Sequence, residues 1–233
     1  MHDQLNRFRM LWFRMGENEM LLLNVPYKEK DEAKKLGAKW NPDIKKWYVQ
    51  DRKEYFRFYK WITTQGRIVA CNNIYVLEGK QKCFKCGRET KVIGFGLEDY
   101  YDFSAYDIED GLTKRVEYYN DVIRIVGPIE PIPETILKYL QKNYNYKMRY
   151  SKTTNESHIN NCCDNCDVLQ GDFFLFSEVD SPFWIDSVEK VKNLKIYRIP
   201  LKNDIILDAS IRYSSTDEWM KEYGDIEVLD ICK

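Results

Sequence analysis

The stretches Cys83-Phe-Lys-Cys86 and Cys163-Asp-Asn-Cys166 decide the fold of this chain of 233 residues. In each C-x-x-C pair a tight turn presents two thiolates to one metal ion, and two pairs supply the four sulfur ligands of a closed tetrahedral zinc site. Gly87 follows the first pair, where a knuckle turn needs a residue that tolerates positive φ. The spacing is unusual, because 76 residues separate the pairs, whereas simple ribbons have roughly 15–20. We predict one structural Zn²⁺ per chain, held by Cys83, Cys86, Cys163 and Cys166, that clamps the ends of a large insertion.

Reduced cysteines in an ordinary core, or a redox pair, are the alternatives to this zinc site. Cys162 is either a spare thiol or an alternative ligand. His158 is either a substitute ligand, a partner of a ligand, or a solvent-exposed loop residue. Cys71 and Cys232 lie in apolar strand contexts, so we expect buried thiols there. An odd number of cysteines, seven, grouped in C-x-x-C pairs favours a reducing cytoplasm with metal rather than disulfides.

The composition is that of a folded, soluble protein, and no apolar run approaches the roughly 20 residues that a membrane span needs. Arginines interrupt the apolar residues of the first 15 positions, and no small-residue cleavage site follows, so we do not expect export. Residues 3–15 have the spacing of a short amphipathic helix that either packs on the domain or docks a partner. Residues 1–80 hold 16 lysines and arginines against 10 acidic residues, and residues 81–233 hold 20 against 27. This asymmetry suggests two functional surfaces, unless it is solvated charge that segregated by chance.

The N-terminal part is predicted to be a β-α-β unit followed by a helix. Its expected elements are a strand at 20–25, a helix at 28–36 capped by Gly37, a turn at 40–43, a strand at 46–50 and a helix at 53–63. The run Leu23-Asn-Val-Pro-Tyr-Lys-Glu-Lys-Asp-Glu-Ala-Lys-Lys-Leu-Gly-Ala-Lys-Trp40, continued by Lys46-Trp-Tyr-Val49, resembles the DUF5710 module, which occurs in bacterial, plasmid and phage proteins. The pattern Gly-Ala-x-Trp, a turn, then Lys-x-Trp is also distantly similar to the HARP domain of annealing helicases, which engages branched DNA.

The remainder is predicted to be rich in strands. A strand at 68–77 leads into the first knuckle, a strand at 90–95 leaves it, and further strands are expected at 116–126, 146–150, 193–201, 204–213 and 227–231. Pro133 begins a helix at 134–143, and a short helix is expected near 216–223. Residues 83–92, 150–153 and 161–176 are similar to a zinc-ribbon region that often follows DUF5710, so the resemblance covers about residues 20–180.

The chemistry that the sequence supports is binding rather than catalysis. Four thiolates close a zinc site, whereas catalytic zinc keeps an open position. A nuclease would need Asp99 with Asp102, or Asp107 with Asp110, to hold Mg²⁺, but a solvated acidic loop explains these residues better. Lysines can neutralise phosphates and exposed aromatic rings can stack on unpaired bases. The tryptophans at 40 and 47 are expected in the module's core, which leaves as candidate nucleic-acid contacts Lys34, Lys35, Lys39, Lys45 and Lys46.

The sequence therefore predicts an α+β protein, in which a small β-α-β module joins a strand-rich, zinc-ribbon-like domain. The predicted domains are residues 1–66 and 67–233, with the insertion at about 97–150. The leading function is a zinc-binding, non-enzymatic nucleic-acid-binding accessory protein of bacterial or phage type, with DNA or RNA as its partner and no membrane association. The alternative is a protein-interaction module, whose acidic, tyrosine-rich insertion docks a protein partner. A metal-dependent nuclease is the third hypothesis.

Overall fold

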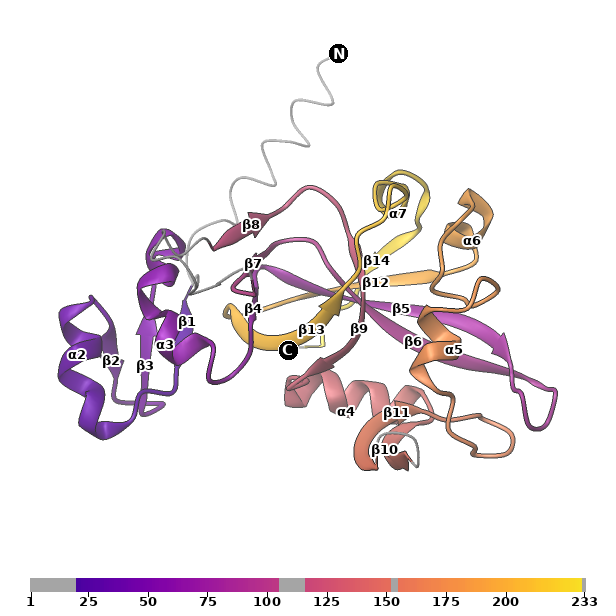
Figure 1. The fold of residues 1–233 in the computed structure, drawn as a ribbon, viewed down its shortest axis with the longest axis horizontal. Coiled ribbons are helices and arrows are strands. Elements are labelled where there is room, and N and C mark those ends of the chain that lie inside the picture. The colour runs from indigo at the N-terminus through magenta and orange to yellow at the C-terminus, as the bar shows by residue number, and fades with distance from the viewer. Residues whose placement is uncertain (1–19, 105–115, 152–154, 232–233) are drawn as a thin grey trace, which may run out of the picture.

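A nine-stranded sheet runs through the body of the molecule in the computed structural model, which describes residues 20–104, 116–151 and 155–231 (Figure 1). Its strand order is β14-β12-β5-β6-β9-β13-β4-β7-β8. In chain order these strands are β4 (Ile68–Ala70), β5 (Asn73–Lys82), β6 (Glu89–Leu97), β7 (Tyr100–Asp102), β8 (Glu117–Tyr119), β9 (Arg124–Glu130), β12 (Lys195–Pro200), β13 (Ile205–Ile211) and β14 (Ile226–Val228). The sheet and its helices confirm the predicted α+β class.

The long β5–β6 hairpin is buried on both faces, because its apolar residues do not alternate with polar ones. On one face Val76 and Phe95 pack in a cluster with helix α4 (Glu134–Asn143). On the other face Leu77 and Val92 pack with α5 (Asp172–Phe176) and α6 (Val188–Lys192). A short helix, α7 (Trp219–Tyr223), covers the same face as α5 and α6. Gly94 of β6 allows close packing of α5, because a Cβ there would lie 3.1 Å from the Phe176 ring.

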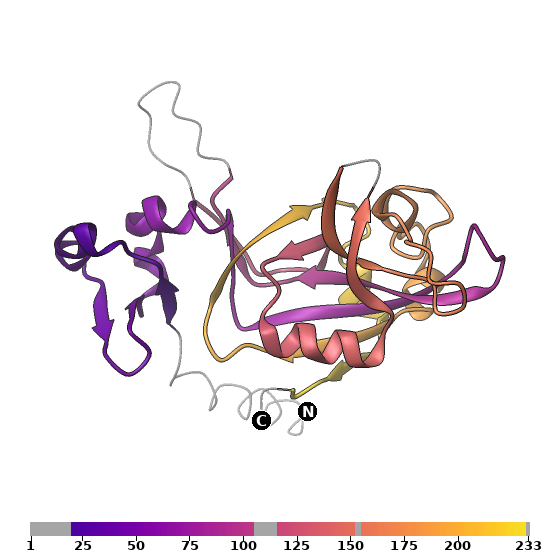
Figure 2. The same cartoon turned by 90° about the horizontal axis from the view of Figure 1, so that it is seen from below.

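The segment between the cysteine pairs is part of this sheet. Strand β9 lies between β6 and β13, near the middle of the strand order. The predicted strand at 116–126 is instead two strands, β8 and β9, and the predicted helix at 134–143 matches α4. A separate hairpin, β10 (Tyr146–Ser151) and β11 (Glu156–Asn161), leads to the second knuckle and lies beside α4 (Figure 2). The insertion thus contributes core strands to the fold.

The N-terminal module has one strand more than predicted. Its three-stranded antiparallel sheet has the order β1-β3-β2. Its elements are β1 (Leu21–Leu23), the 3₁₀ helix η1 (Tyr27–Glu29), α2 (Lys30–Lys35), β2 (Lys39–Asn41), β3 (Lys46–Val49), the 3₁₀ helix η2 (Arg52–Phe58) and α3 (Tyr59–Ile62). The Asn41 side chain accepts a hydrogen bond from the backbone N–H of Asp43 at 3.0 Å, and Lys45 adopts a φ of 52°. This turn begins after Asn41, so the residues predicted as the start of the turn form a strand instead.

Module and sheet share a hydrophobic cluster across the predicted boundary at 66/67. Leu21 and Phe58 of the module pack in one cluster with Val69 and Ile206 of the sheet. The carboxylate of Asp204, just before β13, is 4% exposed and receives two hydrogen bonds of 2.7 Å from Arg52 and one of 2.9 Å from the Tyr55 hydroxyl. The division into two domains stays a prediction, but this joint fixes the module against the edge of the sheet.

Three further expectations concern residues outside the described part of the chain. They are the predicted helix at 3–15, the buried thiol at Cys232 and the acidic pair Asp107 and Asp110. None of the helices in the described part of the chain has the length and apolar character that a membrane span needs.

Candidate metal centre and candidate nucleic-acid groove

The four predicted cysteines meet at one point in space. Their sulfur atoms all lie within 4.8 Å of one another. The Sγ atoms of Cys83 and Cys166 are 3.7 Å apart, as are those of Cys86 and Cys163. A Zn–S bond of about 2.3 Å gives sulfur–sulfur edges of about 3.8 Å in a regular tetrahedron. The arrangement therefore fits a four-thiolate metal site, and the residues required are those that the C-x-x-C pattern predicted.

Two knuckles of the same construction hold the sulfur atoms at the end of the β5–β6 hairpin away from the module (Figure 1). In the first, Gly87 donates to the Cys83 carbonyl at 2.9 Å and adopts a φ of 70°, as predicted. In the second, Asp167 donates to the Cys163 carbonyl at 3.0 Å with a φ of 60°. The left-handed residue in each knuckle turns the chain sharply, so that both thiols of a pair point the same way.

Side-chain hydrogen bonds join the two knuckles. Thr90 Oγ1 accepts from the backbone N–H of Asp164 at 2.9 Å, and Asn165 donates to the Glu89 carbonyl at 3.0 Å. The Gln170 amide points at Cys83 Sγ, 3.6 Å away. A thiolate accepts such N–H donors, and donors of this kind orient metal ligands.

The four thiols lie so close together that their pKa values differ from one another. Burial raises the pKa of Cys163, but backbone N–H groups of Cys166 and Asn165 and the neighbouring thiols outweigh it and lower this pKa to about 6. For Cys166, a hydrogen bond from the backbone of Val168 lowers the pKa, but burial and the neighbouring sulfurs raise it to about 11. Four adjacent thiolates repel one another, so full deprotonation needs a cation among them. A divalent metal ion would supply that charge.

The other metal-ligand candidates lie outside this centre. The Cys162 thiol is buried and directed at the Asn160 carbonyl, 3.8 Å away. His158 is on β11, and its Nε2 is 2.9 Å from Glu156. Cys71 is buried beside Asp204. Within residues 20–104, 116–151 and 155–231, the four cysteines are the only group of three or more potential ligand side chains, and this group includes neither Asp99 nor Asp102.

A second candidate site is a groove in the module, of about 660 Å³, between the segment after β1 and the β2–β3 hairpin. Of the five predicted lysines, Lys45 and Lys46 line it. Lys39 is on β2 and donates to Gln50 at 2.8 Å, whereas Lys34 and Lys35 are exposed on α2. The groove therefore gathers two of the predicted contacts and leaves the other three outside.

The groove also contains residues that the sequence analysis did not select. Tyr27 is 81% exposed, and Lys30 donates to its hydroxyl at 2.9 Å with the ammonium 4.1 Å from the ring centre. Trp40 is 47% exposed, so its prediction as a core residue is wrong. It meets Trp47 edge-to-face, with ring centres 5.6 Å apart, because the two are cross-strand partners. Strand β2 is the edge of its sheet, which leaves the outer side of Trp40 open.

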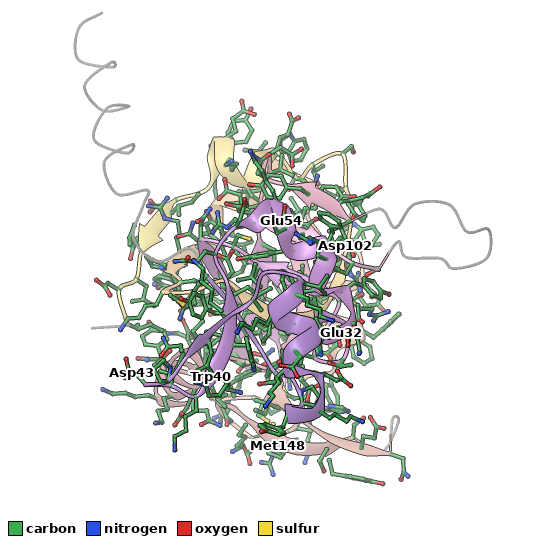
Figure 3. The ribbon with its side chains drawn as sticks, turned by 90° about the vertical axis from the view of Figure 1, so that its left-hand side faces the viewer. Glu32, Trp40, Asp43, Glu54, Asp102 and Met148 are labelled. Atoms are coloured by element: carbon green, nitrogen blue, oxygen red, sulfur yellow. The ribbon has the colours of Figure 1, made fainter. Side chains whose placement is uncertain are left out.

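Two acidic side chains, one on α2 and one on η1, form ion pairs with Lys60 on the side of the module away from this groove. Lys60 lies 2.8 Å from Glu32 and 3.3 Å from Glu29. A hydrogen bond from the Trp61 indole, at 2.8 Å, holds the pKa of Glu29 below its usual range. Figure 3 shows Trp40 on one side of the module and Glu32 on the other. The rim of the groove is therefore basic and aromatic.

The predicted acidic, tyrosine-rich surface of the insertion is only partly within the described residues. Its tyrosines pair across β7 and β8, with ring centres 5.0 Å apart for Tyr100 and Tyr119 and 4.6 Å apart for Tyr101 and Tyr118. The rings thus form two separate cross-strand pairs, and a docking role for the insertion stays a prediction.

Comparison with known proteins confirms the resemblance of the module. Residues 20–63 match the family described as a domain of unknown function, DUF5710. Two curated relatives, both called DNA primase TraC and both from Escherichia coli, are similar to this chain. One is 51% identical over 52 residues, which are 22% of this chain and 4% of that protein. The other is 49% identical over 43 residues, 18% of this chain and 4% of that protein. The chain thus spans a small fraction of these relatives' length, and no solved structure matches it.

Proposed function

We propose that this chain is a nucleic-acid-binding accessory protein of bacterial or phage type that acts in the cytoplasm. In this proposal the groove of the N-terminal module holds a single strand, and Zn²⁺ on the four cysteines stabilises the larger part of the fold. The chain binds and positions nucleic acid without chemical catalysis, because four thiolates leave zinc no open position.

The exposed aromatic rings of the groove carry this proposal. Tyr27 and Trp40 both present ring surface to solvent beside Lys30, Lys45 and Lys46. Unpaired bases stack on such rings, and each base–aromatic stack contributes about 1–3 kcal/mol. Bases inside a duplex do not expose their faces, so we expect the groove to prefer single strands or the unpaired junction of a fork.

The lysines define the salt dependence to expect. Three phosphate contacts on a single strand give a slope of about −0.7 per contact in log K against log salt. Binding should then weaken roughly 20-fold between 50 and 200 mM salt. This predicts a weak, salt-sensitive interaction.

The relatives support a nucleic-acid partner. The matched proteins are named DNA primases, and the DUF5710 match at residues 20–63 includes the residues that line the groove. Because the shared segment is 4% of those proteins, a primase activity is not transferred with it.

The test is fluorescence anisotropy with labelled single-stranded DNA, RNA, duplex and forked DNA at two salt concentrations. Trp40→Ala should weaken single-strand binding about 5- to 100-fold, the equivalent of one lost stack. Lys45→Gln with Lys46→Gln should weaken it more than Lys34→Gln with Lys35→Gln, since only the first pair lines the groove.

Trp184→Ala is the matched control, because Trp184 is 41% exposed and lies outside the module. It should bind like the unaltered chain. No salt-sensitive binding to any of the four probes, or a Trp40→Ala variant that is correctly folded and binds normally, would refute the proposal.

A further inference from the structure

A cleft of about 1040 Å³ lies between the β9–β13 part of the large sheet and the β10–β11 hairpin, and we call it the hairpin cleft. It is separate from the module's groove and from the zinc centre. Large apolar side chains stand on its wall exposed to solvent: Met148 is 58% exposed, Phe173 60% and Phe174 56%. Exposing three such side chains together costs free energy, and such patches mark binding sites for protein segments.

The apolar wall extends to the first knuckle. Phe84, between the first two cysteines, is 70% exposed and stacks on Phe174 with ring centres 6.4 Å apart. Phe174 meets Phe173 edge-to-face at 5.6 Å. These three rings continue the wall of the hairpin cleft as one apolar strip.

Acidic groups dominate the charge of the hairpin cleft. Asp208 is matched by Arg67 at 3.2 Å, and His158 is held by Glu156 at 2.9 Å. Among the described residues, neither Glu130 nor Asp172 has a basic side chain at ion-pair distance. Burial among its neighbours raises the pKa of Asp172, and this effect outweighs the opposite effect of the nearby His158 ring. The cleft thus suits an apolar, basic segment and disfavours phosphate.

We propose that the hairpin cleft is the docking site of residues 1–19 of this same chain. Positions 4–16, Gln-Leu-Asn-Arg-Phe-Arg-Met-Leu-Trp-Phe-Arg-Met-Gly, contain three arginines and no acidic residue, and the three acidic residues of the segment, Asp3, Glu17 and Glu19, stand near its two ends. The apolar side chains of this segment can pack on the aromatic strip, and its arginines can form ion pairs with Glu130 and Asp172.

The segment begins close enough to reach the cleft. The carbonyl of Met20 accepts a hydrogen bond of 3.0 Å from the backbone of Asp204. Asp208, in the lining of the cleft, is four residues further along, which is about 13 Å at the rise of a strand. Nineteen extended residues span up to roughly 60 Å, several times that separation.

The test is photo-crosslinking in the full chain with a benzophenone amino acid in place of Phe8, followed by mass spectrometry. Excited benzophenone inserts into a nearby C–H bond without any added reagent, so carbon atoms at the docking site become attached to position 8. We expect crosslinks to Met148, Phe173 or their neighbours in the cleft, within one chain. Asp172→Asn should lower the yield about fivefold, the effect of one lost ion pair, whereas Asp180→Asn should not change it.

A second variant separates docking from folding. Replacement of Arg7, Arg9 and Arg14 by glutamine changes none of the described residues, and we expect it to lower the crosslink yield without changing the melting temperature. Crosslinks that map to the module's groove, to a second molecule or to no defined site would overturn the proposal. A crosslink yield that is the same in the unaltered chain, in Asp172→Asn and in the arginine variant would also overturn it.

Discussion

Replacing Cys163 by serine removes one of the four sulfur atoms that meet at the end of the β5–β6 hairpin. Structural zinc contributes about 10–16 kcal/mol in small peptides at pH 7, so each of four ligands accounts for about 3 kcal/mol. In a chain of this length, 1 kcal/mol moves the melting temperature by about 2–4 °C. We therefore expect Cys163→Ser to melt roughly 6–12 °C below the unaltered protein and to bind zinc far more weakly.

The matched control is Cys162→Ser, at the adjacent position. The Cys162 thiol is also buried, but it is directed at the Asn160 carbonyl, 3.8 Å away, and is not among the four sulfurs. A serine hydroxyl can donate to the same carbonyl, so this change should cost about 1 kcal/mol or less and leave the zinc content at one per chain. The assay is zinc release into a chromogenic chelator, together with thermal unfolding followed by circular dichroism.

Treatment of the unaltered protein with a strong chelator gives the upper limit of the effect. It should lower the melting temperature at least as far as Cys163→Ser does, and added zinc should restore it. The metal site would be refuted by protein that contains no zinc after growth in zinc-supplemented medium and whose melting temperature does not change when the chelator is added. Equal effects of the two serine variants would show that burial of a thiol, not metal ligation, explains the loss.

Two further predictions concern the joint between module and sheet. Asp204→Asn breaks the buried ion pair with Arg52, so it should lower the free energy of unfolding by about 3–5 kcal/mol in chemical denaturation. The control, Asp208→Asn, breaks an exposed ion pair with Arg67 and should cost less than about 1 kcal/mol. Equal losses in the two variants would contradict the importance of this joint. Burial raises the pKa of Asp99, so the ionised form of this side chain destabilises the folded state. The unaltered protein should therefore lose stability as the pH rises from about 3.9, the pKa of an unfolded aspartate, to the raised pKa of the folded state. The Asp99→Asn variant does not titrate there, so its stability should increase relative to that of the unaltered protein over the same range. Melting temperatures of both proteins across this range test the sign, and an advantage that instead shrinks as the pH rises would contradict it.

Local signals in the sequence predicted much of the fold. Pro133 and the apolar spacing after it predicted α4, whose observed bounds match. The cysteine spacing and Gly87 predicted the knuckles, because a four-thiolate site restricts backbone geometry within a few residues. These features depend on neighbouring positions, which is why one sequence is enough to find them.

The missed features depend on pairing between distant residues. Strand β9 lies between β6 and β13, although β13 follows it by some 75 positions in the sequence. The spacing of apolar residues within a strand does not indicate which distant strand will pair with it. The groove was missed for a related reason. Tyr27 and Trp40 come from different turns, and the exposure of Trp40 follows from β2 being an edge strand, which the turn prediction at 40–43 had excluded.

The position of β9 also explains what the proposed zinc clamp, with such wide spacing, would achieve. In a simple ribbon the residues between the two cysteine pairs form only a short hairpin. Here they supply β6, β7, β8, β9, α4 and the β10–β11 hairpin, so the clamp joins the two ends of a segment that contains core strands of the large sheet. Loss of metal would remove the link between the two knuckles, while the β5–β6 and β6–β9 pairings and the Asp204 joint do not depend on it. The N-terminal module and the tip of the β5–β6 hairpin lie at opposite ends of the molecule (Figure 1), so a metal ion held by the four cysteines would affect the groove only through the stability of the whole fold.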